Sequence, residues 1–145
     1  MEASGPMKIS AKAEYACLAL LALAEQGEEG PPLRIREISE THAIPERYLV
    51  QILLQLKGAG LVVSTRGALG GYRLARSAAK ITLSEVLAVI DGPDAPQRGT
   101  GREKHPAARI LALVWDRVRA AERSVLDTTT IAELVAQTSP HEWTI

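Results

Sequence analysis

The stretch from Ile44 to Leu74 restricts the possible folds more than any other part of this 145-residue sequence. It begins near Pro45, which suits the first position of a helix because the N–H that proline lacks would be unbonded there anyway. Apolar side chains then recur at helical spacing over about three turns, until Gly58 and Gly60 end the pattern. The residues at this spacing are Ile44, Tyr48, Leu49, Ile52, Leu53 and Leu56. The sequence therefore predicts an amphipathic helix that starts at Pro45.

A β-hairpin is predicted directly after this helix. Residues 61–66 have strand character, residues 67–71 read Gly-Ala-Leu-Gly-Gly, and residues 72–76 alternate as a returning strand does. Before Pro45, a short strand is predicted over residues 33–35 and a short helix over residues 36–42. Only a few residues around Ala43 separate the two helices, and this spacing is typical of a helix-turn-helix. The hairpin is then the wing of a winged helix-turn-helix.

Four more helices are predicted around this unit. They cover residues 11–26, 82–90, 105–126 and 131–136. Ser10 can cap the first of them, and Thr82 or Ser84 can open the second. Phe is absent and aromatic residues make up only 3% of the chain, so Ala, Leu, Ile and Val must fill the core, a composition that favours helices. The predicted fold class is mainly α with a small β-hairpin wing.

The long helix carries an apolar stripe at steps of three and four residues. The stripe consists of Ala107, Ile110, Leu111, Val114, Val118, Ala121 and Val125. It is more apolar than one helix on a small domain requires, which favours a dimer interface; the other interpretation is that the helix folds onto its own domain. The residues predicted at the dimer interface are Ile110, Leu111, Val114, Trp115, Val118 and Val125.

The chain divides accordingly into four segments. We predict a winged helix-turn-helix DNA-binding domain over 7–91, a flexible Gly- and Pro-rich loop over 92–104, a dimerisation helix over 105–127, and a short helix with a polar tail over 128–145. No stretch approaches the roughly 18 apolar residues of a membrane-spanning helix. The first residues do not form a secretory signal. These features predict a cytoplasmic protein without membrane contact.

The formal net charge of zero argues at first against nucleic-acid binding, but the charges are unevenly distributed. Between Ile44 and Lys80, six basic residues stand against the single acid Glu46. From Ile81 to the end, seven basic residues stand against nine acids. A basic middle and an acidic remainder suit a protein that presents positive charge on one face.

The predicted DNA-binding residues lie on the third helix, the wing and the start of the first helix. They are Lys8, Lys12, Glu46, Arg47, Tyr48, Val50, Gln51, Arg66, Gly67, Gly70, Gly71 and Arg73. Gln51 can pair with adenine, Arg47 with guanine, and Val50 can touch a thymine methyl group. The glycines let the wing backbone approach the duplex. A basic hairpin can also be a plain solvated edge, protected by its charge against aggregation.

These segments also resemble the Rrf family of winged-helix regulators. The resemblance rests on residues 7–10, 14–16, 44–53, 56–62, 66–67, 70–74, 81–83, Trp115 and 130–135. It covers nearly the whole chain from Met7 to Val135. It implies a transcriptional repressor whose long helix pairs with the same helix of a second copy and with the first helix. Two winged domains would then bind an inverted-repeat operator in double-stranded DNA.

The chain departs from the family members that carry an iron–sulfur cluster. Those members have three cysteines before the long helix and a histidine ahead of its Trp, whereas this chain has its only Cys at position 17 and Ala112 in the histidine position. In another cluster-binding branch Glu14 and His42 would match two ligands, but Leu18 stands where the third belongs. Thiolates are the usual cluster ligands. We therefore expect no metal and no cofactor.

The signal and the exact role remain open at this stage. A metabolic enzyme could bind the dimer, a small ligand could enter between the first and long helices, or Cys17 could be oxidised, although its apolar helix favours an inert core thiol.

Many relatives carry Glu at the position of Val50, so the operator of this protein is expected to differ from theirs. The alternative function is a winged-helix protein-interaction adaptor. An enzyme is not expected, because His42, His105 and His141 are scattered without a catalytic partner.

Overall fold

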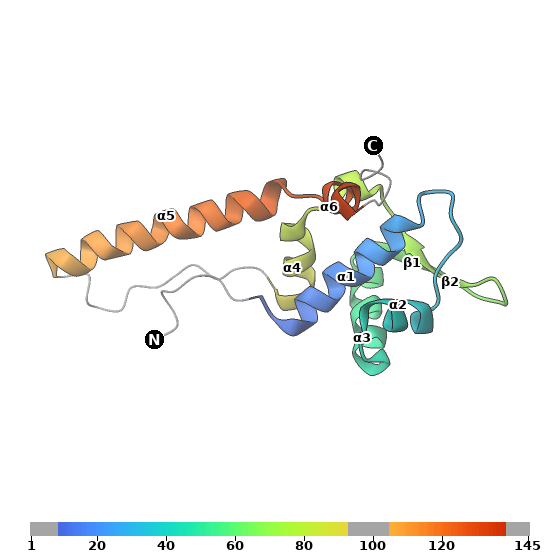
Figure 1. Ribbon diagram of the computed structural model, residues 1–145. Coiled ribbons are helices and arrows are strands. Elements are labelled where there is room, and N and C mark those ends of the chain that lie inside the picture. Colours follow the sequence, from blue (N-terminus) through green and yellow to red (C-terminus); the bar gives the residue numbers. More distant parts are fainter. Residues whose placement is uncertain (1–8, 93–104, 139–145) are drawn as a thin grey trace.

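The computed structural model describes residues 9–92 and 105–138. Lys8 and most of the predicted loop, residues 93–104, lie outside the described residues. The elements are α1 (Ala11–Glu25), α2 (Ile35–His42), α3 (Glu46–Gly58), β1 (Val62–Thr65), β2 (Gly71–Leu74), the 3-10 turn η2 (Ala78–Lys80), α4 (Leu83–Asp91), α5 (Pro106–Thr128) and α6 (Ile131–Thr138). Figure 1 shows a compact body of helices with the hairpin at one end and α5 extending from the other.

Helix α1 runs through the middle of the body and contacts α3, α4 and α6. Ser10 caps it as predicted, since its hydroxyl accepts from the Ala13 N–H at 3.0 Å. Ala13, Ala16 and Ala19 are fully buried along one side, and these small side chains let the neighbouring helices approach closely. The core is completed by aliphatic residues of every other helix except α5.

The turn of the helix-turn-helix is formed by Ala43, whose φ of 55° is left-handed. The Ser39 hydroxyl donates to the Ile44 carbonyl at 2.6 Å, and Ile44 is buried. Pro45 immediately precedes α3, so the prediction that the helix starts at Pro45 was one residue early. Both positions leave the N–H without a helical partner, which is why proline alone does not distinguish them.

The wing is an antiparallel pair in which Val62 lies opposite Leu74 and Thr65 opposite Gly71. Leu33 bonds to Tyr72 through both backbone groups, at 2.9 and 2.7 Å, and thereby anchors the wing to the body. The short strand predicted over 33–35 is thus reduced to this single bridge, because Ile35 already belongs to α2. Gly71 has a φ of 143°, and a Cβ there would lie 2.6 Å from the Leu33 carbonyl oxygen.

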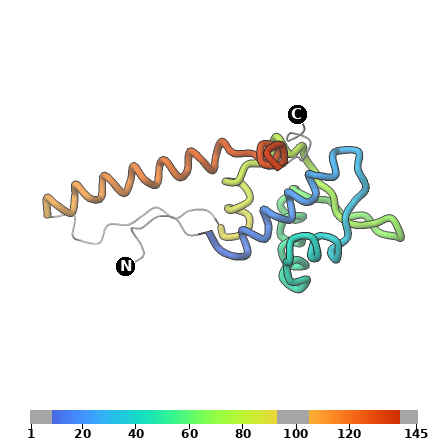
Figure 2. The backbone as a smooth tube through the Cα atoms, in the orientation of Figure 1, coloured from blue at the N-terminus to red at the C-terminus, as the bar shows by residue number. Residues whose placement is uncertain are grey.

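Helices α5 and α6 behave differently although they are consecutive. None of the residues of α5 is buried, and the helix projects beyond the body (Figures 1 and 2). Helix α6 packs back against α1, with Ile131 fully buried and its N–H donating to the Ile81 carbonyl at 2.9 Å. The C-terminal helix therefore shares the core of the winged domain. Within the described ranges no helix is long and apolar enough to cross a membrane.

Candidate nucleic-acid interface

The rotation of α3 is fixed by its buried side. Leu49, Ile52, Leu53 and Leu56 are fully buried, which turns the opposite side of the helix to solvent. The predicted base-facing residues Glu46, Arg47, Val50 and Gln51 all lie on this exposed side. A helix that presents polar, basic and apolar side chains together from its N-terminal half has the groups needed to contact base edges in a major groove.

Arg47 and Tyr48 form one end of an aromatic stack. The Tyr48 ring, which is 44% exposed, stacks on Tyr15 of α1 with centroids 6.2 Å apart and planes 21° apart. The Arg47 guanidinium lies over the Tyr48 ring at 5.0 Å from its centroid, a favourable cation–π arrangement. Tyr15 is 33 positions away in sequence, so nothing in the local pattern of α3 predicted this support.

The wing turn is tightly built and exposed at its tip. Arg66 and Gly67 face solvent, and Leu69 at the tip is 88% exposed. Gly70 is buried, and a Cβ on it would come within 2.2 Å of the Thr65 carbonyl oxygen. Glycine is therefore required at this position for steric reasons. Arg66 comes directly before this turn, and its side chain is exposed.

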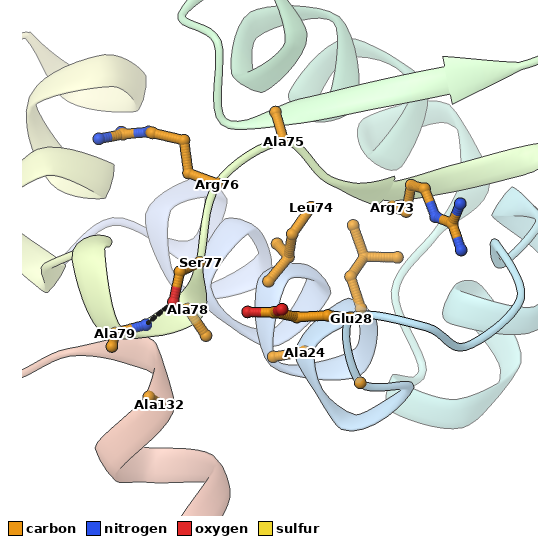
Figure 3. Close-up of a pocket in the computed structure, with 12 residues that line it drawn as sticks. Ala24, Glu28, Arg73, Leu74, Ala75, Arg76, Ser77, Ala78, Ala79 and Ala132 are labelled. Atoms are coloured by element: carbon orange, nitrogen blue, oxygen red, sulfur yellow. Dashed lines mark hydrogen bonds between the residues drawn. The ribbon is translucent and has the colours of Figure 1, made fainter.

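Arg73 was predicted to contact DNA, but its guanidinium donates to the Gly30 carbonyl and its side chain is half-buried. It lines a cavity of about 490 Å³ between the end of α1, β2, η2 and α6 (Figure 3). Arg76, which also lines the cavity, pairs with Glu85 of α4. Two of the basic groups counted in the middle of the sequence are thus engaged with the body of the protein.

Two further basic residues approach the wing from outside it. Arg34, which precedes α2, donates to the Gly67 carbonyl at 3.3 Å and to the Ala68 carbonyl. Lys57 of α3 donates to the Ser64 hydroxyl at 2.9 Å and so links the third helix to β1. Arg34 was not among the predicted DNA-binding residues. The one signal for it in the sequence is a long cationic side chain just before a helix, where a small polar residue is usual.

Lys12, which was predicted to contact DNA, lies in the first turn of α1 and is half-buried.

The predicted dimer residues form an uncovered apolar face on α5. Ile110 is 65% exposed, Leu111 50%, Val114 40% and Val125 60%, while Trp115 and Val118 are half-buried. Leu113, 63% exposed, was not part of the predicted stripe. Apolar side chains gathered along one projecting helix are typical of a surface that a partner covers.

Comparisons with known proteins identify the family of the chain. Residues 9–137 match the family Rrf2, described as an iron-dependent transcriptional regulator. The chain is 39% identical over 132 residues to the HTH-type transcriptional regulator CymR of Bacillus subtilis, which covers 91% of this chain and 92% of that protein. The solved structure of CymR, the global cysteine regulator of B. subtilis, aligns with a TM-score of 0.81 over 92% of this chain and 99% of that one, at 38% identity.

A second solved structure, T. potens IscR, aligns with a TM-score of 0.77 at 29% identity, over 96% of this chain and 93% of that one. Both structures confirm the predicted fold class, mainly α with a two-stranded wing. The resemblance inferred from the sequence motifs is confirmed as well.

The side chains of this chain do not fit the iron centre that the family description implies. Cys17 is its only cysteine, and partial burial against the core, together with the nearby Glu14 carboxylate, raises the pKa of this thiol to about 11. Iron–sulfur clusters need thiolates, usually several. His42 has a buried Nε2 without a hydrogen-bond partner, yet no group of three metal-binding side chains forms in residues 9–92 and 105–138.

Proposed function

This chain belongs to the Rrf2 family and is a transcriptional regulator, and we propose that it is a homodimeric repressor of an inverted-repeat operator. The observation that carries the proposal is the exposed side of α3, where Arg47, Val50 and Gln51 stand together. We assign base contacts to these three residues and phosphate contacts to Arg66 and to Lys12. Tyr48 supports Arg47 from its ring face.

The dimer follows from the apolar face of α5. A monomer would leave Ile110, Leu111 and Val114 more than a third exposed on a helix that has no buried residue. Covering this face with the same helix of a second copy would bury all of them at once. A two-fold dimer also presents two α3 helices, which matches an operator made of two inverted half-sites.

We propose that the chain works without an iron–sulfur cluster, in contrast to the family description. The support is the donor set: one high-pKa thiol in the entire sequence cannot replace several thiolates. Protein purified under anaerobic conditions should be colourless and should contain less than one iron per ten chains by elemental analysis. Stoichiometric iron together with visible charge-transfer absorption would overturn this part of the proposal.

The signal that controls the repressor is assigned to a metabolic enzyme or a small ligand that binds the dimer. The sequence suggested a ligand site between the first and long helices, whereas the cavity described above lies among α1, β2, η2 and α6. Titrating cavity variants and α1–α5 variants with candidate ligands would distinguish these two locations.

The central experiment is a salt titration of binding to a labelled promoter fragment. We expect binding that weakens steeply with salt, because phosphate contacts release counterions. Arg47→Ala combined with Arg66→Ala should abolish specific binding, while Lys80→Ala, which removes an exposed cation from η2, should bind nearly as the unchanged protein does. Absence of binding at low salt, or an unaffected double variant, would remove the repressor proposal and favour the protein-interaction adaptor.

A further inference from the structure

Arg34 occupies the position just before α2, where helices usually gain stability from a small polar side chain. Ser, Thr, Asp or Asn at this position accepts a hydrogen bond from a free N–H of the first turn. Arginine has only donors and cannot do so. Its backbone N–H donates to the Glu37 carboxylate at 2.8 Å, but its side chain does not cap the helix.

The guanidinium of Arg34 instead reaches the wing turn. It donates to the carbonyl oxygens of Gly67 and Ala68, which lie 33 and 34 positions further along the chain. These two residues come directly between Arg66 and the exposed tip residue Leu69. Both bonds leave one guanidinium nitrogen, Nη2, whose N–H groups are fixed in the guanidinium plane; the ammonium of a lysine is a point charge on a flexible stem and holds such a pair less well.

The wing is also held by the residue before Arg34. Leu33 forms a backbone pair with Tyr72 and lies against Gly71, which is opposite Thr65 at the end of the hairpin that leads into the turn. Within the turn, the Gly70 N–H donates to the Gly67 carbonyl at 3.0 Å. Arg34 therefore extends the attachment made by Leu33 into the turn itself and ties Gly67 and Ala68 to the start of α2.

This contact also changes the electrostatics of the turn. A carbonyl oxygen directed outward beside Arg66 would repel a phosphate, whereas an oxygen that accepts from a guanidinium is neutralised. Arg34 itself remains exposed, so its charge stays on the same surface as Arg66. Both effects favour an anionic duplex at the wing.

We propose that Arg34 is a positioning residue for DNA binding, which fixes the wing turn so that Arg66 meets the phosphate backbone. This inference rests on the proposed function, since it concerns the same DNA-binding surface. Arg34 then lowers the stability of α2, because it cannot cap the helix, and raises the affinity of the protein for DNA.

Arg34→Ser tests the proposal because a stabilising role and a positioning role predict opposite results. Serine restores a capping side chain, so the melting temperature should rise by about 3 °C. Affinity for the promoter fragment should nevertheless fall about tenfold, a typical coupling between contacting groups. Arg34→Lys, which keeps the charge but not the planar group, should show most of the same loss. Wild-type affinity in either variant would overturn the proposal.

A double-variant comparison shows through which residue Arg34 acts. In an Arg66→Gln background, Arg34→Ser should weaken binding by less than threefold, because the residue it positions is already gone. In an Arg47→Gln background on α3, the two losses should multiply. Multiplication in both backgrounds would mean that Arg34 does not act through the wing.

Amide hydrogen exchange tests, without DNA, whether Arg34 fixes the wing turn. Without the Arg34 contact, the Gly70 amide should exchange several times faster, while amides of α1 remain unchanged. If the unchanged protein failed to bind DNA, the proposed function would fall and this measurement would still report on the contact. Unchanged Gly70 exchange in Arg34→Ser would show that Arg34 does not fix the turn.

Discussion

The apolar face of α5 gives the most direct prediction about assembly. Ile110 and Val114 lie one helical turn apart and are 65% and 40% exposed. Neither is needed for the fold of a single chain, because no residue of α5 is buried. Truncating both, Ile110→Ala with Val114→Ala, should therefore leave the winged domain intact and weaken only the contact between two copies.

The size of this effect can be worked from the exposed fractions. Fully burying a Val or Ile side chain contributes about 1.5 to 3 kcal/mol, so covering the exposed part of Ile110 or Val114 contributes about 1 kcal/mol. The truncation occurs on both helices of the dimer and removes four such side chains. The dissociation free energy should fall by about 3 to 4 kcal/mol, which raises the dimer dissociation constant by about two to three orders of magnitude.

Sedimentation equilibrium over a range of protein concentrations measures this constant directly. Asp116→Ala is the matched control, because Asp116 lies about 1.7 turns beyond Ile110 and therefore faces away from the stripe. Its side chain is 63% exposed and its surface pair with Arg119 should contribute little. A dissociation constant within threefold of the unchanged protein in the double variant would refute the assignment of this face. So would a monomeric wild type at about 50 µM, well above ordinary dimer dissociation constants.

Three further changes test other parts of the structure. Gly71→Ala should destabilise the protein by about 1 to 3 kcal/mol in thermal unfolding, because Gly71 has a φ of 143° and a Cβ would collide with Leu33; Gly58→Ala, with open space around the added Cβ, is the control. Val50→Glu should shift base preference from thymine towards cytosine by about 1 to 3 kcal/mol in competition with randomised operators, and an unchanged preference would remove Val50 from the base contacts. Cys17, whose pKa is raised to about 11, should alkylate slowly at pH 7.5 and faster up to about pH 11; rapid reaction of the folded protein at pH 7.5 would contradict its burial.

Much of the fold could be predicted because its strongest signals are local. The buried residues of α3 recur at helical spacing, and the hairpin is marked by a glycine-rich turn between two alternating segments. The long helix was predicted from its stripe alone. The boundaries were less certain: Ile35 joined α2 rather than a strand, because the Glu37 carboxylate accepts from the Arg34 N–H and starts the helix there.

The site was less predictable because its supporting contacts join residues far apart in sequence. Arg47 lies over the ring of Tyr48, and Tyr15 stacks on Tyr48 from another helix; nothing in the pattern of α3 indicates which ring will lie behind Tyr48. Alternation along a strand predicts that Arg73 points to the opposite face from Tyr72 and Leu74. It does not predict that the Gly30 carbonyl lies on that face and accepts a hydrogen bond from Arg73. The direction of a long cation depends on the nearest acceptor, and that acceptor is a property of the tertiary structure.

Counting charges along the sequence overestimates the positive charge that residues 44–80 offer to DNA, and it misses the charge that Arg34 brings to the wing. The basic middle of the chain owes part of its excess to Arg73 and Arg76, yet Arg73 bonds to Gly30 and Arg76 pairs with Glu85. Arg34 lies outside that stretch, among several acids, and its guanidinium nevertheless reaches the wing turn next to Arg66. The positive surface available to DNA thus depends on which acceptor each guanidinium bonds to in the folded protein. A chain with no net charge can therefore concentrate cations at the wing and α3, because Glu46 is the only acid between Ile44 and Lys80 and the other acids lie in other parts of the sequence.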